Sequence, residues 1–238
     1  MDLEQKSIER IKMASEMSLH HYELPLICTY SGGKDSDVML ELFKRSGIPF
    51  EVRNSHTTAD APETVYHIRK VFCDLELKGI KCKIDYHRQA DGTATTMWNL
   101  IPKKLMPPTR LVRYCCSVLK ESGNHNRMIA TGVRWSESNA RKKRESFEVI
   151  GKTKKDKVVV SDEKMLLSDN DDRRRLFERC EIKGETVVNP IIDWGEKDIW
   201  DFIRQEHIST NVLYSCGYER VGCIGCPMAG KNMRKKEF

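Results

Sequence analysis

The stretch that decides the fold runs from residue 24 to residue 36 and reads Leu24-Pro25-Leu26-Ile27-Cys28-Thr29-Tyr30-Ser31-Gly32-Gly33-Lys34-Asp35-Ser36. Its first half is a short, nearly continuous apolar run, which is typical of a strand buried on both faces of a sheet. A glycine pair ends this run. Asp35 or Ser36 can then cap a helix whose apolar residues recur on one face until Gly47. The stretch therefore predicts a strand, a tight loop and a helix in succession.

The same alternation continues on both sides of this unit. The predicted strands cover 48–53, 80–86, 128–133 and 186–193, and the predicted helices cover 3–20, 62–78 and 196–205. Strands that alternate with helices in this way form parallel sheets with right-handed crossovers. We therefore expect an α/β protein with a Rossmann-like parallel sheet and helices on both faces.

The amino-acid composition changes between the fourth and fifth predicted strands. Basic residues dominate 141–157, no long apolar periodicity is present, and a hairpin is expected around 158–160. We expect an N-terminal helix (1–22), an α/β core (23–139), a basic insertion or lid (140–185) and a C-terminal part of the core with the Cys-x-x-Cys region (186–238).

Composition narrows the class of protein. The chain has 238 residues, 39% of them hydrophobic and 32% charged, with a net charge of +6. No apolar run approaches the roughly 20 residues of a membrane-spanning helix, and the acidic N-terminal residues do not resemble a signal peptide. We expect a cytoplasmic protein with reduced thiols. Nine cysteines cannot all pair, so clustered cysteines indicate metal or redox chemistry.

The loop after the first strand is suited to an anion. The small residues Ser31, Gly32 and Gly33 let backbone amides turn inward, and Lys34 adds a cation at the start of the next helix. The spacing is not that of a Walker loop. The alternative is a tight turn that uses glycine only for its geometry.

The Ser-Gly-Gly-Lys-Asp-Ser sequence resembles the signature of the adenine-nucleotide alpha-hydrolase superfamily, which includes ATP pyrophosphatases and phosphoadenosine-phosphosulfate (PAPS) reductases. The resemblance implies a site for ATP, adenylylsulfate (APS) or PAPS, with Mg²⁺. It implies that Ser31, Gly32, Gly33 and Ser36 line the phosphate or sulfate, that Lys34 neutralises it, and that Asp35 orients the loop or holds magnesium.

Two further segments resemble the same family. The sequence from Gly132 to Arg141 is similar to a loop whose arginines reach the nucleotide, which makes Arg134 and Arg141 site candidates. Guanidinium is a permanently charged donor suited to phosphate, although both residues could instead be solvated. Thr58 and Asp60 lie where the family has a ligand-facing strand end; alternatively, Asp60 is only a helix cap.

Four cysteines form the second constellation. Cys115 and Cys116 are adjacent, and Cys223 and Cys226 form a Cys-x-x-Cys pair. Four thiolates fit tetrahedral zinc or a [4Fe–4S] cluster. The adjacent pair resembles the cluster pattern of APS reductases, which implies the cluster, with zinc as the alternative. The remaining cysteines, Cys28, Cys73, Cys82 and Cys180, are interpreted as packing residues, and Cys216 as a loop cysteine, a spare ligand or a reactive thiol.

The end of this sequence differs from the reductases. PAPS and APS reductases resemble one another in a Glu-Cys-Gly-Leu-His tail with the attacking cysteine, and residues 231–238 have no such motif. The hypothesis is therefore an enzyme that cleaves ATP between the α- and β-phosphates to adenylate an acceptor for sulfur transfer, with Lys34, Asp35 and Arg134 as catalytic residues.

Two alternatives remain. One is an APS or PAPS reductase that releases sulfite and uses a thiol electron donor, and the other is a non-catalytic nucleotide-binding or cluster-carrying module. Expected partners are an adenine nucleotide and a nucleic acid or a sulfur-carrier protein such as a cysteine desulfurase, with no membrane. The basic segments 141–157 and 231–236 could contact a nucleic acid, although charge runs are more often solvated surface.

Overall fold

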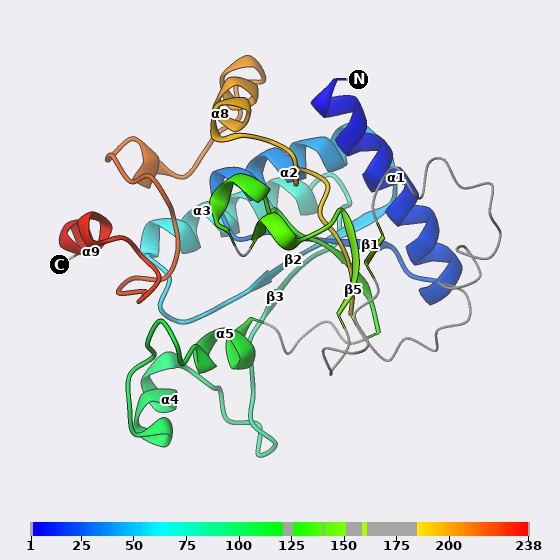
Figure 1. Cartoon of the computed structure of the whole chain (residues 1–238). Helices are drawn as coiled ribbons and strands as arrows, with labels where there is room; N and C mark the ends of the chain where they lie inside the picture. Colours follow the sequence, from blue (N-terminus) through cyan, green and yellow to red (C-terminus); the bar gives the residue numbers. More distant parts are fainter. Residues whose placement is uncertain (1, 121–125, 140, 151–158, 161–184, 238) are drawn as a thin grey trace. The chain divides into compact units, whose positions relative to one another are not determined.

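The computed structural model describes residues 2–120, 126–139, 141–150, 159–160 and 185–237 (Figure 1). The chain divides into two compact units, each made from separated stretches of sequence. Unit 1 consists of residues 1–29, 35–51 and 124–208, and unit 2 of residues 30–34, 52–123 and 209–238.

The described residues of unit 1 contain five strands, in the order β1-β4-β7-β5-β6. The strands are β1 (Leu26–Thr29), β4 (Met128–Ala130), β5 (Phe147–Ile150), β6 (Val159–Val160) and β7 (Glu185–Val188). The helices are α1 (Leu3–Tyr22), α2 (Lys34–Ser46, in this unit from its second residue) and α8 (Glu196–Gln205), with short 3₁₀ turns η1 (Trp135–Glu137) and η2 (Arg141–Lys143).

The centre of this sheet is parallel and buried. β4 pairs in parallel with β1 and with β7, which places Ile129 beside Ile27 on one side and Val187 on the other. These three side chains form a core cluster. Within the apolar run at residues 24–30, the strand forms where Leu26, Ile27 and Cys28 are buried, and burial of each large apolar side chain contributes about 1.5–3 kcal/mol.

Helix α1 is attached to the end of this core by polar contacts. Arg10 is 4% exposed, and its Nη1 donates hydrogen bonds of 2.8 Å to the Pro190 carbonyl and to Asp193 Oδ1. Trp194 Nε1 donates to Ser7 Oγ at 2.9 Å. These contacts hold the segment after β7 against α1.

Unit 2 contains the parallel pair β2–β3. Its strands are β2 (Phe50–Ser55, in this unit from Val52) and β3 (Cys82–Asp85), in register from Val52 beside Cys82 to Ser55 beside Asp85. Its helices are α3 (Pro62–Glu76), α4 (Met97–Lys104), α5 (Tyr114–Leu119) and α9 (Lys231–Glu237), with the 3₁₀ turn η4 (Val212–Tyr214).

Helices α4 and α5 pack on one another through a small apolar cluster of Leu100, Tyr114 and Leu119. The first turn of α4 is closed by a capping box, in which Thr96 Oγ1 accepts from the Asn99 amide at 3.2 Å and Asn99 Oδ1 accepts from the Thr96 amide at 2.8 Å. The cluster fixes the start of α5, where two adjacent cysteines lie.

The expected fold class is confirmed, since a mostly parallel sheet with helices is present. Part of the expected insertion contributes to the sheet, because β5 pairs antiparallel with β7 along residues 147–150. β5 also pairs antiparallel with β6, with Phe147 beside Val160; the other residues of the expected hairpin fall in 151–158 and 161–184, which lie outside the described residues. Among the described helices, none is long and apolar enough to cross a membrane.

Candidate functional site

The predicted phosphate loop follows β1, and its residues 31–34 belong to unit 2. Gly32 has φ of +72°, and a Cβ at this position would lie 2.8 Å from Ile68 Cγ1. Glycine is needed here because another side chain would be both strained and crowded. The Lys34 backbone amide donates a hydrogen bond of 2.9 Å to the Tyr214 hydroxyl. A loop amide at the start of a helix, directed at an oxygen, is an arrangement that suits phosphate.

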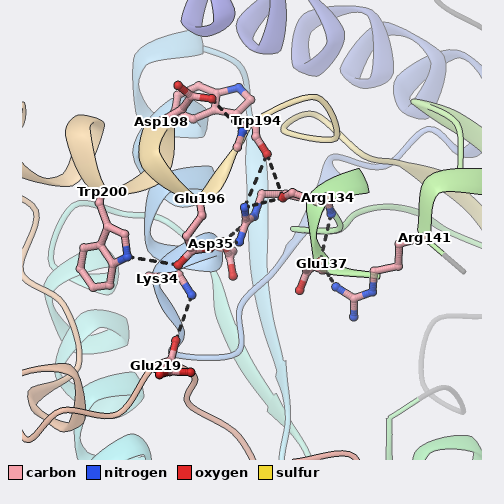
Figure 2. Close-up of polar contacts among 12 residues, drawn as sticks. Lys34, Asp35, Arg134, Glu137, Arg141, Trp194, Glu196, Asp198, Trp200 and Glu219 are labelled. Carbon is pink, nitrogen blue, oxygen red and sulfur yellow. Dashed lines mark hydrogen bonds and ion pairs between the residues drawn. The ribbon is translucent and has the colours of Figure 1, made fainter. Parts of the chain in front are cut away.

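The Lys34 side chain also lies beside Tyr214 and is only 5% exposed. Its Nζ donates to the backbone carbonyl of Glu219 at 3.3 Å (Figure 2). The same atom lies 5.6 Å from the centre of the Tyr214 ring. Hydrogen bonds from an ammonium to an anion are stronger than those to a neutral oxygen. The buried cation is therefore well suited to an incoming phosphate oxygen.

Arg134, in unit 1, is the most buried charged side chain of the predicted set, at 2% exposed. Its Nε lies 2.8 Å from Asp35 Oδ1, and its Nη2 lies 2.8 Å from Glu196 Oε2 (Figure 2). Its Nη1 donates to Ser136 Oγ at 2.9 Å. The two carboxylates fix the guanidinium and offset the cost of burying it. Asp35, predicted to orient the loop or bind magnesium, thus contacts Arg134.

Arg141 lies on the same stretch after β4 and forms an ion pair with Glu137 (Figure 2). Glu137 Oε2 also accepts a hydrogen bond of 3.1 Å from the Arg134 backbone amide. A single acid thus links the two predicted arginines. Arg141 has the more exposed side chain, at 36%, so it is the more accessible of the two cations.

Thr58 and Asp60 lie on the loop between β2 and α3 in unit 2. Thr58 has φ of 62°, an uncommon conformation for a β-branched residue, and its hydroxyl accepts from the Met97 amide at 2.8 Å. Asp60 Oδ2 accepts from the Thr57 amide at 3.1 Å, and Asp60 pairs with Cys223 in an antiparallel bridge. Asp60 therefore also organises the surroundings of a predicted metal ligand, whereas Thr58 contacts the start of α4.

All four predicted metal ligands lie in unit 2. Cys115 and Cys116 occupy the first turn of α5, and the Cys226 amide donates to the Cys223 carbonyl at 3.3 Å. Cys223 Sγ lies 3.2 Å from Thr57 Oγ1.

Electrostatic effects connect these thiols. Burial raises the pKa of the Cys115 thiol, and the neighbouring Cys116 and then Cys226 raise it further. The pKa of Arg113 is raised by its hydrogen bond to Cys116, whose Sγ lies 3.1 Å from Nη2, with smaller effects of Cys226 and Cys115. The pKa of the Cys223 thiol is raised by burial. The cysteines of α5 are thus within electrostatic range of the Cys-x-x-Cys segment.

The donor set suits a thiolate-bound metal group in its chemistry, with an arginine beside it to balance negative charge. Within the described ranges, however, no three His, Cys, Asp or Glu side chains are gathered closely enough to hold one metal ion. The thiols are therefore neighbours in one unit without surrounding a common point. Of the remaining cysteines, Cys28 is buried, and Cys73 and Cys216 are exposed.

Sequence reasoning assigned no role to several residues that contact the predicted ones. Tyr214 and Glu219 contact Lys34, and Glu196 contacts Arg134. Asn211 is 1% exposed, and its Nδ2 donates to the Gly32 carbonyl at 3.4 Å. These contacts join positions at least 60 residues apart, so no local spacing signal could have found them.

Comparison with known proteins identifies the class. Residues 25–229 match the phosphoadenosine phosphosulfate reductase domain, and the chain belongs to that family. The match covers the phosphate loop, the arginine segment and all four clustered cysteines.

Three relatives illustrate the similarity. The chain is 28% identical to the uncharacterized protein MJ0973 of Methanocaldococcus jannaschii, over 99% of this chain and 50% of that protein. It is 27% identical to sulfate adenylyltransferase subunit 2 of Streptomyces lavendulae, over 81% of this chain and 57% of the relative. The chain thus spans about half the length of these curated relatives. The crystal structure of PAPS reductase from Candida auris has a TM-score of 0.56 at 16% identity, covering 92% of this chain and 88% of that one, and supports the fold.

Proposed function

We propose that the protein is an adenylating enzyme that binds ATP at residues 31–36, cleaves it between the α- and β-phosphates, and activates an acceptor for sulfur transfer. The observation that carries the proposal is that Lys34 offers two hydrogen-bond donors, one from its backbone and one from its side chain. Its backbone amide and its buried Nζ are both directed at oxygen acceptors, Tyr214 Oη and the Glu219 carbonyl. A phosphate group can accept from both donors.

Electrostatic stabilisation would be the main contribution of the chain to such a reaction. The acceptor oxygen attacks the α-phosphorus, the bond from this phosphorus to the bridging oxygen breaks, and pyrophosphate leaves with the electron pair. The acceptor proton passes to solvent. Lys34 stabilises the charge that develops on the phosphates, since preorganised donors in a buried site are effective there. ATP enters as its Mg²⁺ complex.

Arg134 is the second proposed cation. Asp35 and Glu196 hold its guanidinium in a fixed orientation, so little reorganisation is needed when a phosphate oxygen binds. Asp35 then acts as a positioning residue. Arg141, Thr58 and Asp60 complete the proposed nucleotide-binding set, together with Ser31, Gly32, Gly33 and Ser36.

Cys115, Cys116, Cys223 and Cys226 would hold a [4Fe–4S] cluster, with zinc as the alternative group. Such a cluster, when bound, would supply a metal centre at which sulfur can be carried. Arg113 would balance its negative charge through the side chain that now contacts Cys116. The proposed macromolecular partners are a nucleic acid or a sulfur-carrier protein such as a cysteine desulfurase.

The test is incubation of anaerobically purified protein with ATP and, separately, with APS or PAPS. Pyrophosphate release from ATP supports adenylation. Sulfite release from APS or PAPS with a thiol reductant supports the second candidate, a sulfonucleotide reductase, which is favoured by the family to which residues 25–229 belong. Tight binding of nucleotide with neither product would indicate a non-catalytic module.

Matched variants assign the activity to the loop. Lys34→Met removes the buried cation, and Lys44→Met removes a lysine of the same helix that pairs with Glu41 at 3.1 Å. We expect the first variant to lower kcat/KM by about 10²–10³-fold, as for loss of one preorganised donor, and the second to leave it unchanged. Equal activity of both variants would contradict the proposed role of the loop.

A further inference from the structure

The segment from Asn211 to Cys226 contacts both predicted sites of unit 2. The first contact is that of Asn211, whose Nδ2 donates to Thr64 Oγ1 at 3.1 Å and to the Gly32 carbonyl at 3.4 Å. Its Oδ1 accepts from the Leu213 amide at 3.0 Å. A fully buried amide with both ends hydrogen-bonded is rigidly placed. Asn211 therefore attaches the start of η4 to the phosphate loop.

Tyr214 makes the next contact. Its hydroxyl oxygen accepts from the loop amide that a phosphate oxygen would also use. Its Oη accepts from the Lys34 amide at 2.9 Å and would lie 3.4 Å from a Cβ at Gly33. A phosphate oxygen that accepts from the same amide must share it with the phenol or displace the phenol. The Tyr214 hydroxyl is thus placed to respond directly to an anion in the loop.

The Lys34 side chain contacts the segment further along. Its Nζ donates to the Glu219 carbonyl at 3.3 Å, four positions before Cys223. Beyond this point the segment is held by the 57–60 loop: the Ile224 amide donates to the Ala59 carbonyl at 2.8 Å, and Cys223 Sγ lies 3.7 Å from Asp60 Oδ1. One continuous segment therefore joins the proposed phosphate donors to half of the proposed thiolate set.

We propose that Tyr214 is a positioning residue that transmits occupancy of the phosphate loop to the Cys223–Cys226 segment. A phosphate group attracts the Lys34 amide and Nζ more strongly than the neutral oxygens of Tyr214 and Glu219 do. When the Tyr214 hydroxyl and the Glu219 carbonyl lose their hydrogen bonds from Lys34, the segment that follows Tyr214 is held less tightly. By linkage, any group that fixes the cysteines in the loosened arrangement tightens phosphate binding by the same factor. This inference rests on the proposed function, because it requires an anion at residues 31–34.

Backbone hydrogen exchange of the full-length protein tests the inference, with inorganic pyrophosphate as the probe. Binding of pyrophosphate is first measured by calorimetry. Exchange of the peptide amides over 219–226 is then compared with and without saturating pyrophosphate. We expect exchange in this segment to become about fivefold or more faster, the lower end of usual coupling between sites. A segment of unit 1 outside the proposed site, helix α1 (Leu3–Tyr22), serves as the internal control and should not change.

Two conservative variants distinguish an effect of the Tyr214 hydroxyl from an effect of the packing of its ring. Tyr214→Phe keeps the ring and removes the hydroxyl, whereas Tyr218→Phe removes a hydroxyl that donates to the Lys236 carbonyl at 3.3 Å. We expect Tyr214→Phe to bind pyrophosphate but to lose most of the exchange response, and Tyr218→Phe to respond as the parent does.

The outcomes are distinct. If the parent protein binds pyrophosphate and exchange over 219–226 is unchanged or slower, the coupling is overturned while the phosphate site stands. If it binds no pyrophosphate, the proposed nucleotide site itself fails, and the coupling with it. The comparison of the parent with and without ligand decides the coupling even if Tyr214→Phe folds poorly. A full exchange response in folded Tyr214→Phe would overturn the role of the Tyr214 hydroxyl.

Discussion

Replacing Gly32 by alanine perturbs the phosphate loop in two ways that can be estimated separately. Gly32 and Gly47 have nearly the same backbone conformation, with φ of +72° and +70°. A Cβ at Gly32 would lie 2.8 Å from Ile68 Cγ1, while one at Gly47 would have nothing within 4 Å. Gly47→Ala is therefore a matched control that carries the conformational cost alone.

The expected magnitudes follow from these contacts. A left-handed conformation costs an L residue about 1–2 kcal/mol, which is the loss of unfolding free energy expected for Gly47→Ala. Overpacking against Ile68 adds about 1–3 kcal/mol, so Gly32→Ala should lose about 2–5 kcal/mol in all. Because Ile68 is buried, at 4% exposed, it has little room to move away.

The assay is urea unfolding of the parent, of the single variants Gly32→Ala, Gly47→Ala and Ile68→Ala, and of the double variant Gly32→Ala/Ile68→Ala. In the double variant the overpacking should be relieved, so that its loss of unfolding free energy is smaller than the sum of the losses of Gly32→Ala and Ile68→Ala. Equal losses for Gly32→Ala and Gly47→Ala would refute the close packing of the loop on α3. Additive losses in the double variant would refute it as well.

Two further predictions concern the ion pair of α1 and the thiols. Burial raises the pKa of Asp193, but hydrogen bonds from Arg10 and Lys6 outweigh it and hold the pKa below its usual value; the stabilisation is therefore complete above about pH 4 and is lost as pH falls through the folded-state pKa. The urea midpoint should fall more steeply below about pH 4 in the parent than in Asp193→Asn, and parallel profiles would contradict this. Cys223→Ser should abolish the brown colour and bound iron of anaerobically purified protein, whereas Cys73→Ser, at an exposed site on α3, should retain both; colourless parent protein with one zinc per chain would contradict the cluster.

Much of the fold could be predicted because the core strands are continuous apolar runs. β1 lies within the predicted apolar run at 24–30, and helix α8 covers the predicted range 196–205. Both were predictable because the buried residues of β1 are consecutive and those of α8 follow the period of a helix. Helices α4 and α5 were missed because they have only 8 and 6 residues, and α4 contains Pro102, which is unfavourable inside a helix. β5 was missed because basic residues obscure its pattern, and its pairing with β7 is a long-range contact.

The candidate site was predictable to a different degree. Gly32 and Lys34 could be singled out from the sequence, because a tight glycine turn followed by a cation is a pattern of consecutive residues. The partners of Lys34 could not be found, because Tyr214 is 180 positions away in sequence. Likewise, the contact of Arg134 with Asp35 depends on how the chain folds.

The measurement that tests the central claim most directly is calorimetric titration of the protein with α,β-methylene-ATP and Mg²⁺, which cannot be cleaved at the proposed bond. The account predicts saturable binding that Lys34→Met weakens by about 10–150-fold, the equivalent of a charged hydrogen bond worth about 1.5–3 kcal/mol. Lys44→Met should bind as the parent does. Absence of binding by the parent, or equal affinity of the parent and Lys34→Met, would contradict the assignment of residues 31–36 as the nucleotide site.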